Sequence, residues 1–189
     1  MLGQLGLEFR VVAASFEERT TGADPTAVVV ANALGKAREV AKRSGIPEAG
    51  AVLGADTEVV LDGVVLGKPA DAAAARAMLV ALGGRTHEVI TGVALITRAD
   101  EVTAHEMTRV QLRGLGAAEI DWYVATGEWR ERAGAYAIQG AGAVLVGRVE
   151  GDPSNVIGLP MARVARLLAD AGLWPQPSAL PGRDHHPPR

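Results

Sequence analysis

The sequence predicts a mixed α/β domain, and three observations support this fold class. Segments rich in valine, isoleucine and threonine alternate along the chain with alanine-rich segments of helical character. Asp62 and Gly63 separate two short apolar runs, which is a strong signal for a β-hairpin and therefore for antiparallel strands. Hydrophobic residues make up 48% of the 189 residues, which is enough for the core of one domain or of two closely packed lobes.

The first elements in chain order are a short strand and a long helix. Residues 7–12 have the mixed apolar pattern of a strand. Asp24 followed by Pro25 is typical of a helix start, because the aspartate side chain caps free amides and proline fits the first helical position. We expect this helix to end at Gly45.

A hairpin and a second helix follow. Residues 51–55 form a short apolar run, and residues 58–61 and 64–66 form the two arms of the hairpin. Residues 72–82 are rich in alanine and predict a helix that begins after Asp71 as its N-cap.

The second half of the chain predicts a sheet with helices interspersed. Residues 87–97 and 101–112 are long strand candidates. Residues 117–126 predict a helix, residues 143–149 a strand, and residues 160–171 a last helix.

The domain is expected to cover residues 1–174. Residues 175–189 contain five prolines and no apolar periodicity, so we expect a disordered proline-rich tail there.

Composition excludes several classes of function. Lys and Arg number 19 against 22 Asp and Glu, and this net charge of −3 gives no basic surface for duplex nucleic acid. The sequence has no cysteine, which excludes disulfides and thiolate metal sites. It contains neither a long apolar run nor a signal peptide pattern, so we expect a cytoplasmic protein that does not bind a membrane.

Two segments near the hairpin contain candidate site residues. Asp56 and Thr57 follow small residues at a strand end, where a carboxylate and the backbone can approach a ligand; the alternative is a turn acid with a local capping role. Lys68 lies between Gly67 and Pro69. This is not a P-loop, since the spacing of the glycines is wrong and no Ser or Thr follows, but Lys68 can still pair with a phosphate.

Three later segments have both a functional and a purely structural interpretation. His87, at the start of a strand, is more often a structural hydrogen-bonding residue than a catalyst. Gln139 can donate and accept, which suits the edge of a base, although a buried loop amide is the alternative. Residues 150–160 form a polar, glycine-containing loop before a helix that can present amides to an anion or simply connect two elements.

Taken together and in order, these segments closely resemble the Maf family of nucleoside triphosphate pyrophosphatases. LGQLGLEF (2–9) and ANALGKA (31–37) also resemble that family, and the likeness covers residues 2–173. The segments with the strongest likeness are GADTEVVLDGVVLGKP (54–69), GRTHEVITGVAL (84–95), TGEWRERAGAYAIQG (126–140) and GDPSNVIGLP (151–160).

The resemblance implies a fold and an activity. The fold is α/β and similar to that of inosine triphosphate pyrophosphatases, with a long mixed sheet in two lobes around a central nucleotide cleft. The activity is hydrolysis of a nucleoside triphosphate to the monophosphate and pyrophosphate, with Mg²⁺ or Mn²⁺ as the divalent metal. The resemblance also implies a homodimer.

The resemblance also implies roles for individual residues. Asp56 matches the catalytic base, and Glu18 matches an acid that can hold the metal together with Asp56. Lys36 and Lys68 match catalytic lysines that offset charge on the phosphates.

The base preference follows from one position. Gln139, in Ile-Gln-Gly, matches the subgroup that acts on dTTP and UTP, and modified pyrimidine nucleotides are equally suitable substrates. Thr57 is expected to contact the substrate beside it.

One departure from the family concerns the N-terminus. Family members begin with an apolar strand and an S-x-R-R loop whose serine and arginine contact phosphate, whereas this sequence begins with what resembles the end of the following helix. We therefore expect a coding sequence that starts further upstream, and a 189-residue chain that is less stable and less active than one extended by about 10–20 residues. The missing loop also leaves a competing hypothesis, a non-catalytic nucleotide-binding regulator linked to cell-division arrest.

Overall fold

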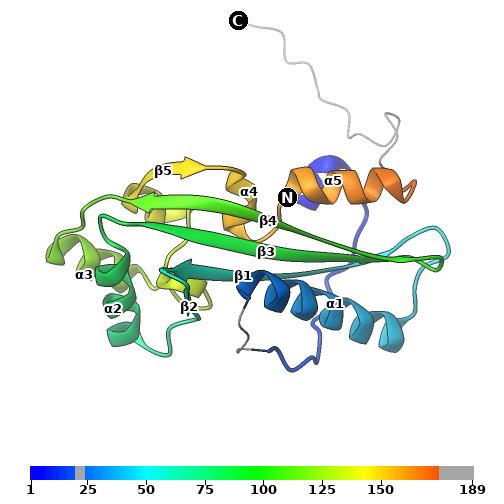
Figure 1. The fold of residues 1–189 in the computed structure, drawn as a ribbon, viewed down its shortest axis with the longest axis horizontal. Coiled ribbons are helices and arrows are strands. Elements are labelled where there is room, and N and C mark those ends of the chain that lie inside the picture. Colours follow the sequence, from blue (N-terminus) through cyan, green and yellow to red (C-terminus); the bar gives the residue numbers. More distant parts are fainter. Residues whose placement is uncertain (20–23, 175–189) are drawn as a thin grey trace, which may run out of the picture.

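The computed structural model describes residues 1–19 and 24–174, and its centre is one five-stranded sheet (Figure 1). The strand order is β2-β1-β3-β4-β5. The strands are β1 (Val52–Leu61), β2 (Val64–Leu66), β3 (Thr86–Ile96), β4 (Glu101–Leu112) and β5 (Val146–Glu150). The proline-rich tail expected over residues 175–189 lies outside the described residues.

Helices cover both faces of this sheet. The α-helices are α1 (Pro25–Ser44), α2 (Ala72–Leu82), α3 (Ala117–Thr126), α4 (Pro153–Ile157) and α5 (Met161–Asp170). Three 3₁₀ helices complete the elements in the part of the chain that the structure describes: η1 (Leu2–Leu5), η2 (Ala133–Ala135) and η3 (Gly140–Leu145). No helix within residues 1–19 and 24–174 is both long and apolar enough to cross a membrane.

The α/β fold class is confirmed, but the sheet differs from the expected mixed one. Every pairing between the described strands is antiparallel. Tight hairpins reverse the chain between β1 and β2 and between β3 and β4. Helix α2 then returns the chain to the end of β1, so that Val60 faces Glu88 and β3 runs back along β1. Short connections of this kind produce antiparallel neighbours.

Local signals located most element boundaries correctly. The Asp24 side chain accepts a hydrogen bond from the Thr26 amide, and the Asp71 side chain accepts one from the Ala74 amide, as expected of N-caps. Asp62 and Gly63 both have positive φ, which is the conformation of a tight two-residue hairpin.

Four local expectations were wrong. Residues 7–12 form no strand; η1 precedes them, and residues 6–19 contain no helix or strand. The expected runs 51–55 and 58–61 are not separate, because residues 52–61 form one continuous strand, β1. The last strand begins at Val146, because residues 140–145 form η3. The loop at 150–160 contains the short helix α4.

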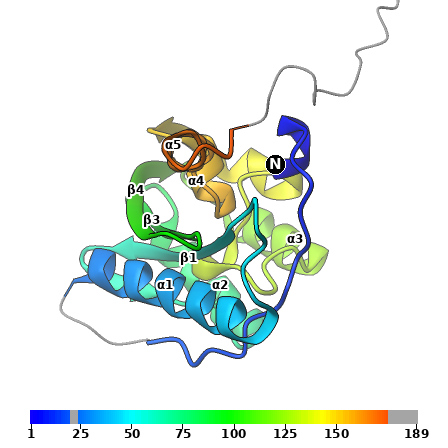
Figure 2. The same cartoon turned by 90° about the vertical axis from the view of Figure 1, so that its right-hand side faces the viewer.

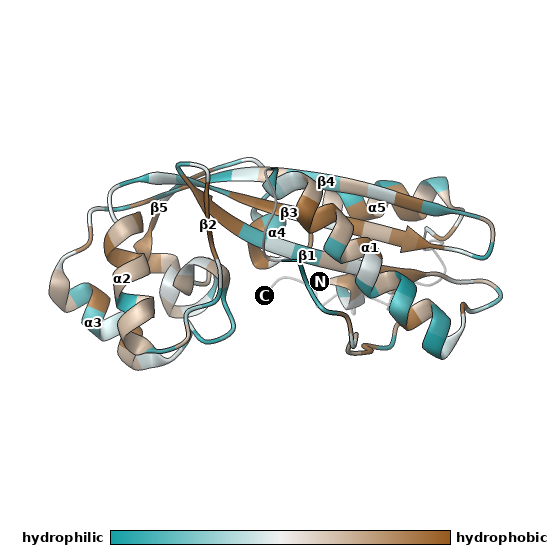
Figure 3. Cartoon of the chain, turned by 60° about the horizontal axis from the view of Figure 1, so that its bottom comes forward, coloured by the Kyte–Doolittle hydropathy of each residue, from teal (hydrophilic) through white to brown (hydrophobic). Residues whose placement is uncertain are grey.

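Alternate residues of β1 and β3 face the two sides of the sheet, and the helices that cover these sides form two lobes. On one face, Val60 and Ile90 pack against Val29 of α1. On the opposite face, α5 covers one end of the sheet, and Figure 2 shows α1 and α5 on opposite sides of the strands. Helices α2 and α3 cover the other end, so the lobes are separate along the sheet (Figure 3).

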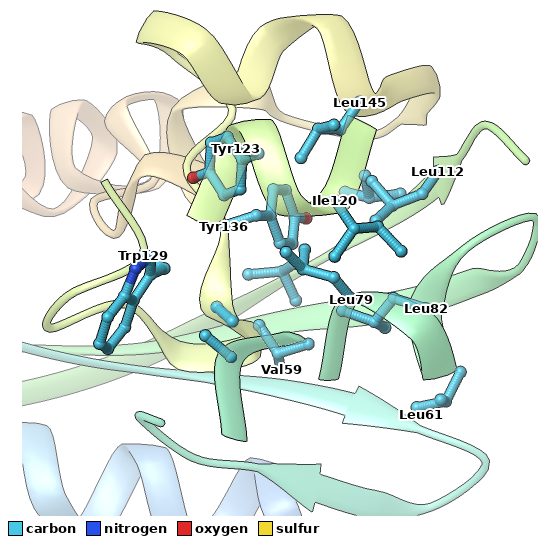
Figure 4. Packing of buried hydrophobic residues seen from close by; sticks show 14 residues of the cluster. Val59, Leu61, Leu79, Leu82, Leu112, Ile120, Tyr123, Trp129, Tyr136 and Leu145 are labelled. Carbon is cyan, nitrogen blue, oxygen red and sulfur yellow. The ribbon is translucent and has the colours of Figure 1, made fainter. Parts of the chain in front are cut away.

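The α2–α3 lobe contains the largest buried cluster (Figure 4). Val59 of β1 contacts this cluster together with Leu79 of α2 and Tyr123 of α3. His87 lies beside it, is 2% exposed, and places its Nε2 atom 2.8 Å from the Tyr136 hydroxyl. This geometry agrees with the structural role that is commoner for a histidine at a strand start.

Buried His87 makes a pH dependence of stability the expected result. Burial lowers the pKa of His87 from 6.5 to about 4. The unfolded chain binds a proton near pH 6.5, so this stabilisation is complete above pH 6.5 and is lost as the pH falls towards 4. We expect His87 to account for a loss of about 2–3 kcal/mol in the free energy of unfolding over this window. Urea unfolding at a series of pH values measures it.

The control is the same substitution at an exposed histidine. His87→Gln is expected to flatten the pH dependence between 6.5 and 4, whereas His105→Gln is expected to leave it as in the wild type. Identical slopes in all three proteins would contradict the assignment to His87.

Candidate functional site

A cleft of about 420 Å³ lies between the two lobes. Glu18 and Lys36 line it from the α1 side, and Gly158 lines it beyond α4. Lys68, after β2, and the segment before η3 line it from the other lobe. This is the central cleft that the fold class predicts.

The open edge of β1 forms the floor of the cleft. Among the described residues, β1 pairs with β3 over residues 52–60 but with β2 only over residues 59–61. Five consecutive residues, 55–59, line the cleft. Side chains of both faces of a strand can share one cleft only where the cleft reaches the edge of that strand. Asp56 and Thr57 therefore approach the same space from opposite faces.

Two glycines of the sheet bring α1 close to Asp56. A Cβ atom at Gly54 would clash with the carbonyl of Ala33, and one at Gly92 would clash with the backbone of Val29. The absence of these two Cβ atoms allows the backbone of α1 to approach β1 and β3 directly. Asn32 and Lys36 are four residues apart on α1, so they share the face that this approach turns towards Asp56.

Asp56 is the centre of a charged network. Its side chain is 8% exposed, and its Oδ1 atom lies 2.6 Å from the Nζ atom of Lys36. The same ammonium lies 2.6 Å from Oε1 of Glu18. The Asn32 amide donates to Oδ2 of Asp56 at 2.9 Å. Asn32 also accepts from the Arg19 amide and donates to the Arg19 carbonyl, which fixes the orientation of its own amide.

The charges in the cleft shift the pKa of two of its residues. Burial alone would lower the pKa of Lys36, but the hydrogen bonds and charges of Asp56 and Glu18 together raise it. Burial, followed by the negative charges of Asp56 and Glu18, raises the pKa of Glu58 to about 7. Glu58 therefore lies where further negative charge is disfavoured and a cation is favoured.

Thr57 belongs to a hydrogen-bonded series on the other face of β1. Its hydroxyl lies 2.9 Å from that of Thr91, which donates to the Asn155 carbonyl. The Asn155 side chain is fully buried and donates to the Val89 carbonyl and the Thr108 hydroxyl. This series ties the loop at 151–158 to the strand that carries Asp56 and Thr57.

The opposite wall contains the remaining sequence candidates. Lys68 lies 3.3 Å from Glu131, and both side chains are largely exposed. Gln139 lines the cleft and is exposed, so it is not the buried loop amide of the alternative interpretation.

All six residues predicted from the sequence line this one cleft. They are Glu18, Lys36, Asp56, Thr57, Lys68 and Gln139. Sequence reasoning missed Asn32 and Glu58. The signal for Asn32 was its spacing of four residues from Lys36 on a helix, and the signal for Glu58 was its spacing of two residues from Asp56 on a strand.

The donor set suits a hard divalent cation. No group of three His, Asp or Glu side chains within residues 1–19 and 24–174 is close enough to hold a metal ion without other ligands. Mg²⁺ in phosphate-handling enzymes is usually bound by one or two carboxylates together with water and substrate phosphates. Asp56 and Glu18, both 2.6 Å from one ammonium, fit that pattern.

Comparison with known proteins gives a consistent result. The family model described as "Maf-like protein" matches residues 1–171. A protein of Symbiobacterium thermophilum named dTTP/UTP pyrophosphatase is 48% identical over 173 residues, which cover 91% of this chain and 88% of the relative. Relatives of the same name in Anaeromyxobacter dehalogenans and Moorella thermoacetica are 50% and 49% identical, covering 94% and 92% of this chain and 92% and 89% of their own. The resemblance found in the sequence segments is thus confirmed, and this chain belongs to the Maf-like protein family.

Proposed function

We propose that this protein hydrolyses dTTP and UTP to the monophosphate and pyrophosphate. The observation that carries the proposal is the meeting of two kinds of group in one cleft: the network of Asp56, Lys36 and Glu18, and the exposed amide of Gln139. The first kind is suited to phosphates and the second to the edge of a base. Relatives that cover most of the chain are named for this activity.

Asp56 is proposed as the group that accepts a proton from the attacking water. Its Oδ2 atom is held by Asn32, and its Oδ1 atom by Lys36, so the carboxylate has one orientation. A carboxylate within hydrogen-bond reach of the water can serve as general base. Lys36 and Lys68 are proposed to offset the negative charge that develops on the phosphates.

Glu18 and Asp56 are the residues proposed to hold Mg²⁺ or Mn²⁺. When bound, such an ion lowers the pKa of a water ligand and polarises phosphoryl oxygens. The contribution of the chain is to place the two carboxylates on either side of Lys36, each 2.6 Å from its Nζ atom. With the two carboxylates holding a cation, Lys36 would be available to a phosphate oxygen.

Gln139 is proposed to select pyrimidines, with Thr57 contacting the substrate from the floor of the cleft. Gln139→Glu replaces a group that donates and accepts by one that only accepts, so it loses the hydrogen bond to O4 of thymine or uracil. We expect kcat/KM for dTTP and UTP to fall relative to GTP by about 10- to 100-fold, which is the contribution of one hydrogen bond to the base. An unchanged ranking of substrates would exclude Gln139 from the base pocket.

Release of pyrophosphate from a panel of nucleotides tests the function itself. The panel holds dTTP, UTP, dCTP, GTP and modified pyrimidine triphosphates, each with Mg²⁺ and with Mn²⁺. Turnover that is fastest with dTTP and UTP supports the proposal. Binding without turnover of any nucleotide would contradict it and favour a regulator. Action in the cytoplasm is part of this proposal, and the homodimer stays a prediction that light scattering can check.

A further inference from the structure

The backbone on both sides of Gln139 is held by groups from α3 and the turn that follows it. Gln139 lies between Tyr136, whose hydroxyl contacts His87, and η3. No other described residue forms a hydrogen bond with its side chain, which is exposed at the cleft. The position of this amide therefore depends on what holds the neighbouring peptide groups.

On the C-terminal side, the carboxylate of Glu128 holds two peptide groups. It accepts hydrogen bonds from the amides of Ala141 at 2.9 Å and Gly142 at 3.1 Å. The contact is so close that a Cβ atom at Gly140 would lie 2.6 Å from Oε1 of Glu128, and Gly140 also has a φ of +76°. The first turn of η3, directly after Gln139, is thus fixed to Glu128.

On the N-terminal side, Tyr123 of α3 holds the chain. Its hydroxyl accepts a hydrogen bond from the Ala137 amide at 3.1 Å, and the residue is fully buried in the α2–α3 lobe (Figure 4). The turn after α3 places Glu128 five residues beyond Tyr123. One short piece of chain therefore holds the peptide groups before and after Gln139.

Glu128 is not among the residues that line the cleft, whereas Gln139 is. A carboxylate that accepts from two backbone amides forms charge-assisted hydrogen bonds, which are stronger than neutral ones. It holds the amides of Ala141 and Gly142, and Gln139 is the cleft-lining residue that lies nearest to them along the chain.

We propose that Glu128 is a positioning residue for base recognition, which fixes Gln139 at the cleft through the amides of Ala141 and Gly142. This rests on the proposed function in one respect, namely that Gln139 meets the base. Loss of the carboxylate frees the Ala141 and Gly142 amides, loosens the turn that follows Gln139 and lowers the preference for pyrimidines, without removing any group that touches the nucleotide.

The test measures binding and not turnover, so that it does not depend on hydrolysis. The probes are the α,β-imido analogues of dUTP and GTP, which resist cleavage between the α and β phosphates. Calorimetry gives the ratio of their Kd values, the pyrimidine preference, for the wild type, Glu128→Gln, Gln139→Ala and the double variant. We expect Glu128→Gln to reduce the preference about tenfold in the wild-type background, the lower end of what hydrogen bonds to a charged group contribute.

The double variant separates positioning from general destabilisation. In the Gln139→Ala background, Glu128→Gln is expected to change the preference no further, because its effect passes through Gln139. Asp121→Asn on α3 removes an exposed carboxylate that pairs with Arg76, and it is expected to leave the preference as in the wild type. Thermal unfolding of each variant shows which of them fold.

Three results would overturn the proposal: an unchanged preference in folded Glu128→Gln, an equal loss in both backgrounds, or no preference in the wild type. If Glu128→Gln does not fold, Glu128→Asp replaces it in the same cycle. A wild type that binds the dUTP analogue selectively but releases no pyrophosphate from dTTP would contradict the proposed function. The role of Glu128 would then still be supported by the change in the ratio of Kd values.

Discussion

Replacing Asp56 by asparagine is expected to lower kcat for dTTP by about 10²–10⁴, the usual contribution of a general base. Asparagine keeps the shape of the side chain, and its carbonyl at the position of Oδ2 can still accept from the Asn32 amide, but its NH₂ group then faces Nζ of Lys36 in place of an acceptor. It cannot accept a proton from water, and it is a weaker ligand for a divalent cation. The loss is therefore expected in turnover more than in folding, and steady-state kinetics with Mg²⁺ measures it.

Asp62→Asn is the matched control for this substitution. Asp62 is on the same strand-and-turn unit, in the β1–β2 hairpin, where it pairs with Arg85 away from the cleft. Asparagine tolerates the positive φ of this position. We expect Asp62→Asn to turn over dTTP at the wild-type rate. If Asp56→Asn retained more than half of that rate, Asp56 would not be the base.

The sequence predicted those parts of the fold that depend on neighbours along the chain. The N-caps Asp24 and Asp71 and the Asp62–Gly63 turn involve groups within three residues of one another, and all are found where expected. Their physical causes are local, so no knowledge of the tertiary structure was needed to locate them.

The errors arose where tertiary contacts decide. Asp56 and Glu58 interrupt an apolar run, which suggested that one strand ended and another began. Asp56 lies within a continuous strand because Lys36 and Asn32 of α1 satisfy its carboxylate. A polar side chain that has partners across an interface does not end a strand. Those partners are 20 and 24 residues away in the sequence, beyond any local pattern.

The same distinction applies to the candidate site. Motifs indicated the side chains that line the cleft, but not how they pair. The hydrogen bond from Asn32 to Asp56 depends on how closely α1 approaches the sheet, which Gly54 and Gly92 allow. The contact of Thr57 with Thr91 depends on the register of β1 and β3, in which these residues are direct partners. Register and helix approach are properties of the assembled fold, so the sequence alone could not predict either contact.

Replacing Lys36 by methionine has the second largest expected effect, because Lys36 is the cation closest to both carboxylates of the network. Methionine keeps the length of the apolar stem but removes the ammonium that lies 2.6 Å from Asp56 and from Glu18. We expect kcat/KM for dTTP to fall about 10²–10³-fold, as when a preorganised charge-stabilising group is removed.

The same substitution is expected to destabilise the fold. Asp56 is buried, and an unpaired buried charge typically costs about 3–5 kcal/mol; because Lys36 is partly exposed, we expect about 2–3 kcal/mol less free energy of unfolding at pH 7. Lys36→Met therefore differs from Asp56→Asn, which removes the buried charge itself and is expected to affect turnover more than stability. Urea unfolding of both variants makes this comparison. Lys42→Met in the last turn of α1 is the matched control, and it is expected to affect neither stability nor turnover by more than a small factor.

The pH dependence of this stability difference identifies its cause. The folded protein raises the pKa of Lys36, so the contribution of its charge is complete below the ordinary lysine pKa of about 10.4 and is lost as the pH rises through the folded value. The difference between the wild type and Lys36→Met is therefore expected to be constant from pH 7 to about 10 and to shrink above that. A difference that stayed constant at high pH would contradict the assignment to charge, because it would show that the charge of the ammonium is not what holds Asp56 and Glu18 together.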